Sequence, residues 1–160
     1  MKISKVSCTQ FAGIRNQEFT FTDGINLVYG KNESGKSTLA NLIGYILFQN
    51  NKLDGRTDKD FIENFFPVCK KGSNLEFDFA DGQLTIETED GTYVLKKEWE
   101  RHKLSKAGNV SLSTPDGVIK DADRINEVLK SILLYGKGIY SDFLLTPQRN
   151  LDTSLKSLLN

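Results

Sequence analysis

The residues best suited to chemistry form one short run, Gly30-Lys31-Asn32-Glu33-Ser34-Gly35-Lys36-Ser37. The run fits the pattern G-x-x-x-x-G-K-[ST] at every fixed position, the pattern of the Walker A or P-loop. Its glycines allow backbone N–H groups to point at phosphate oxygens, and Lys36 adds a full positive charge. Ser37 offers a hydroxyl for the Mg²⁺ that bridges the last two phosphates. We therefore expect this loop to bind a nucleoside triphosphate as its magnesium complex, most simply Mg-ATP.

The same reasoning assigns roles within the loop and just after it. Lys36 is the expected catalytic group, and Ser37 the expected metal ligand. Thr38 would serve the α-phosphate through its backbone N–H, because the N-terminus of a helix carries partial positive charge. The predicted nucleotide-binding residues are Gly30, Asn32, Glu33, Ser34, Gly35, Lys36, Ser37 and Thr38.

Two elements must position such a loop, a strand before it and a helix after it. The apolar run 25–29 stops at Gly30, a pattern typical of a strand buried on both faces of a sheet. From Lys36 to Phe48 the residues are apolar nearly all round a helix, so that helix should be buried on most sides.

The remaining segments predict an α/β fold, with a mixed sheet around the buried phosphate-loop helix and an antiparallel β layer. The first strands alternate through Ile3, Val6, Cys8, Phe19 and Phe21, and end at a turn at Asp23-Gly24. Residues 49–71 read as a long polar connection with three phenylalanine anchors, and residues 72–119 as the β layer. Turns are expected in that layer at Asp81-Gly82, Asp90-Gly91 and residues 114–117, because Asp-Gly between alternating hydrophobics favours a hairpin.

Helical patterns follow the β layer. Asp121 can cap a helix that carries Ile125 and Leu129 on one face, and Gly136 can close it. A second helical stretch is expected over 139–145. Apolar residues after Pro147 recur at helical spacing over 150–160.

Composition excludes several classes of protein. The chain has 21 basic and 21 acidic residues, so it lacks the excess of Lys and Arg that usually marks a nucleic-acid-binding protein. It has no signal-peptide pattern and no apolar stretch of about 18 residues, so a cytoplasmic protein without a membrane span is expected. Cys8 and Cys69 should be reduced thiols, and His102, the only histidine, a surface residue.

A family resemblance rests on particular residues. The lead-in Gly24-Ile25-Asn26-Leu27-Val28-Tyr29-Gly30, followed by 32–39, resembles the N-terminal head segment of SMC-like ABC-type ATPases. The closest types are the SbcC and RecF families and the YhaN-like group of AAA family ATPases, many of which act in DNA repair. The resemblance spans nearly the whole chain, 1–160, as the N-terminal lobe of an ATPase head.

The resemblance also implies roles for residues outside the loop. Gln148, within 143–151, would be the Q-loop residue that completes the shell of magnesium and attacking water, and so both a metal-site and a catalytic residue. A glutamine carbonyl oxygen is a neutral ligand for a hard cation while its amide group can still donate. Residues 150–160 would begin a coiled-coil arm.

Two departures loosen the assignment to one subfamily. Break-repair members carry an Arg-Ser pair after the first Phe, whereas this chain has Ala12-Gly13-Ile14, with Arg15 as the weaker candidate for contacting the nucleotide. Glu33 stands where many members have glycine.

Elements that this family needs for hydrolysis are missing from the sequence. No apolar run ends in Asp-Glu, and the only Ser-Gly is Ser34-Gly35 within the loop. The chain therefore reads as half a head that needs a C-terminal lobe before it can turn over ATP. By resemblance, two completed heads would form an ATP-dependent homodimer, and a nuclease subunit is a possible further partner.

Other functions stay open at this point. A transporter nucleotide-binding subunit shares the loop, and Phe11 could mimic its base-stacking aromatic residue. A small-molecule kinase would need an Arg-rich lid, and the head of a phage-defence (overcoming-lysogenization-like) ATPase looks similar. DNA binding follows from the family alone, with Lys70-Lys71, Lys96-Lys97, 101–103 and Lys106 as candidate phosphate contacts.

Overall fold

The computed structural model describes residues 1–31, 34–66, 79–100 and 108–133. Within them the elements are β1 (Lys2–Phe11), β2 (Ile14–Thr20), α1 (Lys36–Phe48), α2 (Lys59–Asn64), β3 (Phe79–Thr88), β4 (Gly91–Glu100), β5 (Val110–Thr114), β6 (Gly117–Ile119) and α3 (Ala122–Ile132). The α/β class expected from the sequence is confirmed. None of the helices in these ranges is long and apolar enough to cross a membrane.

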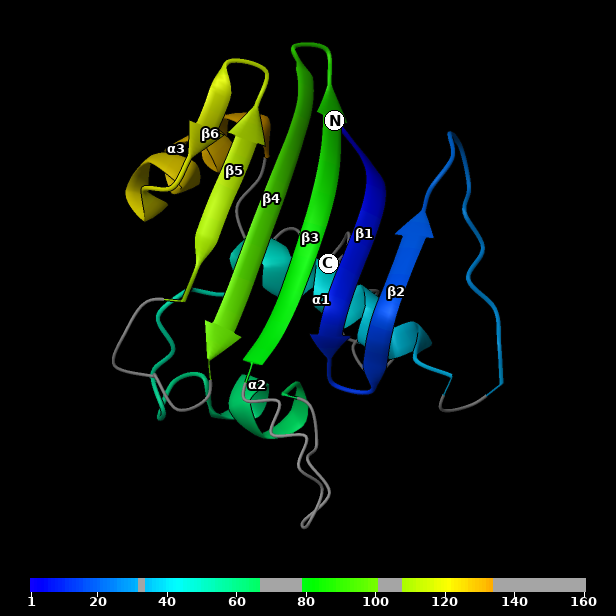
Figure 1. The fold of residues 1–160 in the computed structure, drawn as a ribbon. Coiled ribbons are helices and arrows are strands. Elements are labelled where there is room, and N and C mark those ends of the chain that lie inside the picture. Colours follow the sequence, from blue (N-terminus) through cyan, green and yellow to red (C-terminus); the bar gives the residue numbers. More distant parts are fainter. Residues whose placement is uncertain (32–33, 67–78, 101–107, 134–160) are drawn as a thin grey trace, which may run out of the picture.

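The strands form one six-stranded sheet in the order β2-β1-β3-β4-β5-β6 (Figure 1). Each described pair of neighbours is antiparallel. The mixed sheet expected around the phosphate-loop helix is therefore wrong for the described strands, because the strand predicted over 25–29, which would flank the loop, does not form. β1 joins the N-terminal hairpin to the later strands, because Val6 lies opposite Phe19 on one side and opposite Leu84 on the other. The antiparallel layer is thus continuous with the first two strands, a pairing across about 80 residues of sequence that local patterns do not encode.

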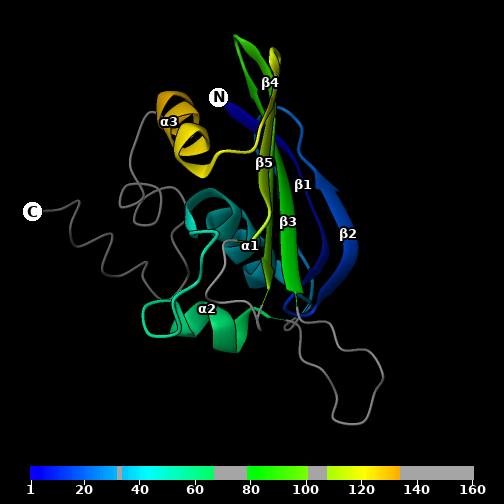
Figure 2. The same ribbon diagram turned by 60° about the vertical axis from the view of Figure 1, so that its left-hand side comes forward.

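The described helices α1 and α3 lie on one side of the sheet, with α2 near the lower end in the view of Figure 2. Alternate residues of β3 and β4 point toward that side, and Leu84, Ile86, Leu95 and Trp99 are fully buried there. Helix α1 therefore packs on an apolar face of the sheet.

Helix α1 has the predicted bounds. It begins after Gly35, which adopts a left-handed conformation with φ 88°, and it buries Leu39, Leu42, Ile46 and Leu47. Ala40 and Asn41 are exposed, so burial covers one face and its flanks and does not extend all round the helix.

The buried strand predicted over 25–29 is wrong. These residues form no strand, and the exposed fractions of Ile25, Leu27 and Tyr29 are 98%, 81% and 86%. A strand needs a hydrogen-bonded neighbour as well as apolar side chains, and none of the described strands pairs with this segment. The apolar residues of this segment favour burial, but no described part of the chain packs against them.

The turn predicted at Asp81-Gly82 is also wrong, since both residues lie inside β3. The Asp81 carboxylate accepts hydrogen bonds from the backbone N–H groups of Thr9 and Gln10, at 3.0 and 2.7 Å. Gly82 lies under α1, where an added Cβ would come within 2.5 Å of the Ile46 side chain. Asp81 therefore holds the end of β1 through its side chain, and Gly82 lets α1 approach the strand closely, a role that glycine within a strand often has.

Other local predictions are confirmed. Glu89 and Asp90 turn β3 into β4, and Pro115 and Asp116 turn β5 into β6. Asp121 caps α3 by accepting from the backbone N–H of Arg124 at 2.9 Å. The connection after α1 contains α2, and its anchors Phe61 and Phe66 are buried, with Phe65 packed against them. Gly136, the helix over 139–145, residues 150–160, Cys69 and His102 lie outside the described residues.

Candidate phosphate-binding site

The loop before α1 includes one position, Gly35, whose backbone conformation favours glycine. Gly35 has a positive φ of 88°, which L side chains rarely adopt. At Gly30 a Cβ would lie 2.6 Å from the Ser34 hydroxyl oxygen, so a side chain there would require that hydroxyl to turn away. The loop is held further by a hydrogen bond from the Ser34 N–H to the Lys31 carbonyl at 3.3 Å. The backbone conformation thus requires glycine at position 35, whereas Gly30 is favoured by its close contact with the Ser34 side chain.

Lys36 is folded back across this loop. Its ammonium group donates to the carbonyl oxygens of Gly30 and Lys31, at 2.8 and 2.7 Å, and to the Ser34 hydroxyl at 3.3 Å. All three acceptors belong to the loop itself, so the cation lies over the turn that would surround a phosphate. An anion at the N-terminus of α1 would meet this charge together with the partial positive charge of the helix.

The remaining loop residues divide into those that the structure places and those outside it. Ser37 is exposed in the first turn of α1, and Thr38 is partly buried beside it. Asn32, Glu33 and Gln148 lie outside the described residues, so their roles stay predictions.

Arg15 lies on β2 close to the loop but is engaged with its own hairpin. Its guanidinium group donates to the carbonyl oxygens of Ala12 and Ile14, at 2.7 and 3.0 Å. The neighbouring Ile14 side chain is the group that faces Gly35, at 3.9 Å from the position of a built Cβ. The structure therefore brings the hairpin to the phosphate loop through Ile14, and uses Arg15 to close the hairpin turn.

Phe11, which could have mimicked a base-stacking residue, is fully buried. Its ring packs against Tyr45, Phe61 and Phe65 with centroid distances of 6.2, 6.3 and 5.6 Å. A ring enclosed in this way has no free face for a nucleotide base. The specific support for a transporter subunit is thereby removed.

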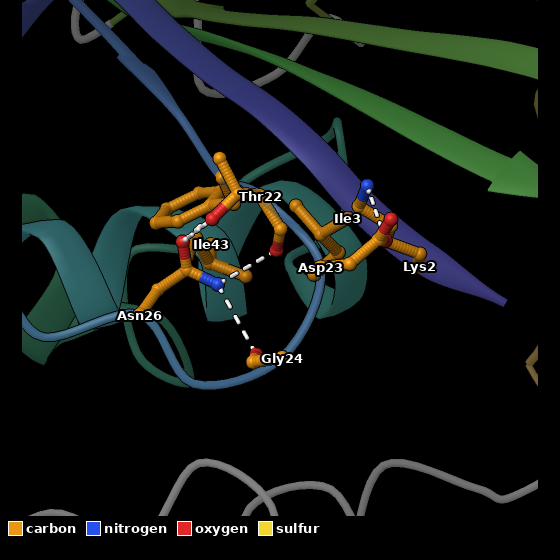
Figure 3. A pocket seen from close by; sticks show the side chains of 8 residues that line it. Lys2, Ile3, Thr22, Asp23, Gly24, Asn26 and Ile43 are labelled. Atoms are coloured by element: carbon orange, nitrogen blue, oxygen red, sulfur yellow. Dashed lines mark hydrogen bonds and ion pairs between the residues drawn. The ribbon is translucent and has the colours of Figure 1, made fainter.

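An open pocket of about 460 Å³ lies between β1, the loop after β2 and α1 (Figure 3). Its lining includes Ile43 in the middle of α1 but none of residues 30–38. The Asn26 side chain accepts from the Thr22 N–H at 2.9 Å and donates to the Thr22 carbonyl at 2.9 Å, while Lys2 pairs with Asp23 at 2.8 Å. The polar groups of this pocket are satisfied by one another, so the phosphate loop is the better candidate for ligand binding.

Two side chains at the far end of α1 were missed by sequence reasoning. Lys97 is 6% exposed, and its ammonium group donates to the Gln49 carbonyl oxygen at 2.8 Å. The Trp99 indole N–H donates to the Asn50 carbonyl oxygen at 3.0 Å. The signal was present in the strand alternation, because Lys97 stands between Leu95 and Trp99 on the inward face of β4.

The surroundings of Lys97 change its acid–base behaviour. Burial lowers the pKa of the Lys97 ammonium group to about 8, because the charged form loses its water. The suggestion that Lys97 contacts DNA phosphates is therefore wrong, while Lys96, on the other face of β4, is exposed. Lys70-Lys71, 101–103 and Lys106 lie outside the described residues. Burial likewise raises the pKa of the Cys8 thiol to about 11, as expected of an inert core cysteine.

Comparison with known proteins places this geometry in context. A family model described as an AAA domain matches residues 5–158. Curated relatives include the DNA double-strand break repair Rad50 ATPases of Thermoplasma acidophilum and Thermoplasma volcanium. Each is 23% identical over 154 residues, which is 95% of this chain and 16% of the relative. The chain thus spans about a sixth of the length of these relatives, and the resemblance to an SMC-like ATPase head segment is confirmed.

Proposed function

Because the chain belongs to the AAA domain family, we propose that it binds the triphosphate of Mg-ATP through residues 30–38 and the N-terminus of α1. The observation that carries this proposal is the position of Lys36. Its ammonium group lies over a glycine-dependent turn, bonded to the carbonyls of Gly30 and Lys31. A phosphate would offer that cation a stronger, charge-assisted partner than neutral carbonyl groups do.

The residues of this site carry the chemical groups that a magnesium nucleotide needs. The Ser37 hydroxyl, exposed at the first turn of α1, would hold Mg²⁺ and the Thr38 N–H would face the α-phosphate. Gln148 would complete the metal shell, as the family resemblance implies. The metal would supply charge neutralisation between the last two phosphates. The chain's own part is to orient the triphosphate and to contribute the Lys36 charge.

We further propose that another part of the same protein covers residues 25–29 and completes an ATPase head of the Rad50 kind. Ile25, Leu27 and Tyr29 are large and almost fully exposed, next to the phosphate loop. Adjacent exposed apolar residues of this kind mark an interaction surface. In the Rad50 ATPase of Thermoplasma acidophilum the matched segment is 16% of the protein, so most of that relative lies outside it. Hydrolysis, ATP-dependent pairing of heads, association with a nuclease and a role in DNA break repair belong to this completed protein.

Nucleotide binding is tested by comparing two lysines of one loop. Lys36→Met should lower the affinity for Mg-ATP at least about a hundredfold, because a charge-assisted contact to phosphate is lost. Lys31→Met is the matched control, since the loop uses the carbonyl of Lys31 and not its side chain. Isothermal titration of both variants and the parent chain measures the difference. Equal affinities in the two variants would refute the proposal.

A further inference from the structure

The end of α1 farthest from the phosphate loop is clamped by the β layer. Three consecutive carbonyl groups, those of Gln49, Asn50 and Asn51, each accept a hydrogen bond from a different residue. The donors are the Lys97 ammonium group, the Trp99 indole N–H and the Gly108 backbone N–H, at 2.8, 3.0 and 3.1 Å. We call these six residues the helix clamp.

The donors of the helix clamp are themselves fixed. Lys97 and Trp99 are two residues apart on the inward face of β4 and are both buried. At Gly108 a Cβ would collide with the Glu98 carbonyl oxygen, so the close approach of this backbone requires glycine. Gln49 is held from its other side as well, because its amide donates to the Asp58 carboxylate at 2.8 Å.

Burying a lysine at this position costs free energy unless the ammonium group makes a favourable interaction. Among the described residues no carboxylate forms an ion pair with Lys97; its strand neighbours are Gly82 and Val110, which do not titrate. The nearest acidic group in the hydrogen-bond chain is Asp58, which is bonded to Gln49 and to the Asp54 N–H. The charge of Lys97 therefore faces the negative end of the α1 macrodipole. This attraction offsets only part of the loss of water, since burial still lowers the pKa of Lys97.

We propose that Lys97 is a positioning residue for nucleotide binding, and that it acts through α1 to hold the phosphate loop in register with the sheet. This inference rests on the proposed function. Helix α1 is about 20 Å long, so a rigid helix carries a shift at its C-terminal end to its N-terminus. Small misplacements of groups that bind a reacting ligand are costly.

The test compares two adjacent lysines in the same strand. Lys97→Met keeps an unbranched apolar stem but removes the donor, while Lys96→Met removes an exposed charge on the opposite face. In Lys97→Met, amide hydrogen exchange should rise at Gly35 and through the first turn of α1, and Mg-ATP should bind about tenfold more weakly. Lys96→Met should match the parent chain in both measurements.

A pH profile separates positioning from simple packing. As pH rises from 7 to 9.5 the parent chain should lose its affinity advantage over Lys97→Met, because a neutral amine is a weaker donor than an ammonium group. Trp99→Phe removes the second donor together with part of a fully buried ring, so it should also weaken Mg-ATP binding, but to the same extent at every pH. An exchange increase confined to residues 49–53, or an affinity equal to that of Lys96→Met, would overturn the inference. Failure of the proposed function would appear separately, as absence of Lys36-dependent binding in the parent chain, and the exchange at Gly35 would still decide whether the clamp acts.

Discussion

Two adjacent lysines on β4 show how strongly position decides the role of a residue. Lys96 points to the open face of the sheet, whereas Lys97 points inward and reaches the Gln49 carbonyl. As a pair in the sequence they resemble a basic patch, but the alternation of a strand sends them to opposite faces. When basic residues are consecutive on a strand, only every second one can therefore lie on the same face and contact a nucleic acid there.

The lowered pKa of Lys97 predicts how stability depends on pH. The unfolded group titrates near 10.5 and the folded group near 8, so between these values the unfolded chain binds more protons. The free energy of unfolding should therefore rise as pH goes from 8 to 10.5, by on the order of 3 kcal/mol from this residue. Urea unfolding at several pH values, in the parent chain and in Lys97→Met, isolates the contribution as their difference. A difference that does not change with pH would contradict it.

The Asp81 side chain takes the place of backbone carbonyl groups as the hydrogen-bond acceptor for the end of β1. Its carboxylate accepts from the N–H groups of Thr9 and Gln10, and Gln10 is buried. Asp81→Ala should cost about 1–3 kcal/mol of unfolding free energy, because the buried donor is left unpaired. Asp81→Asn keeps one acceptor oxygen and should cost less. Chemical denaturation of both variants measures this, and equal losses would argue against the hydrogen-bond explanation.

At the scale of elements, patterns that act within a few residues could be read from the sequence. The bounds of α1, the Asp121 cap of α3 and the turn at Asp90 each depend on neighbouring residues only. The Asp81-Gly82 pair has the same local signature as a turn, yet it pairs with β1 and supports α1 from 35 or more residues away in sequence. Contacts of an Asp-Gly pair with distant parts of the chain cannot be predicted from the residues next to it in sequence.

The contact between β3 and α1 gives a matched pair of glycine variants. Gly82→Ala would place a Cβ 2.5 Å from the Ile46 side chain and 3.0 Å from that of Leu42, and should destabilise the chain by about 1–3 kcal/mol. At Gly13 a Cβ would meet nothing within 4 Å, so Gly13→Ala should change stability by less than about 0.5 kcal/mol. Thermal unfolding of both variants tests whether α1 rests as closely on the sheet as described.

At the scale of the whole molecule, residues 25–29 are a mostly apolar segment that the described part of the chain leaves exposed. Their apolar sequence predicted burial, but the pairing partner that burial requires is absent from the described residues. The loop at 30–37, in contrast, could be proposed as a phosphate site from sequence, because glycine spacing and a lysine suffice to define the motif. The contact between Lys97 and the C-terminal end of α1 could not be predicted from sequence, because it depends on how β4 packs against that end of the helix.

The exposed segment predicts a measurable tendency to associate. Leu27→Lys should reduce self-association of the chain and its binding of an apolar fluorescent dye, because it places a charge on the apolar surface. Val118→Lys, at an exposed valine on β6, is the control and should have a smaller effect. Light scattering and dye fluorescence at matched concentrations compare the two, and equal effects would show that 25–29 is not a distinct interaction surface.

The central claim is that this chain can bind Mg-ATP through Lys36 and needs further protein to hydrolyse it. The most direct test measures binding and turnover on the same preparation, with Lys36→Ala alongside. We expect binding that Lys36→Ala abolishes, together with negligible phosphate release from the chain alone. Steady phosphate release by the chain alone, lost in Lys36→Ala, would contradict the claim of an incomplete site, and absence of Lys36-dependent binding would contradict the claim of a nucleotide site.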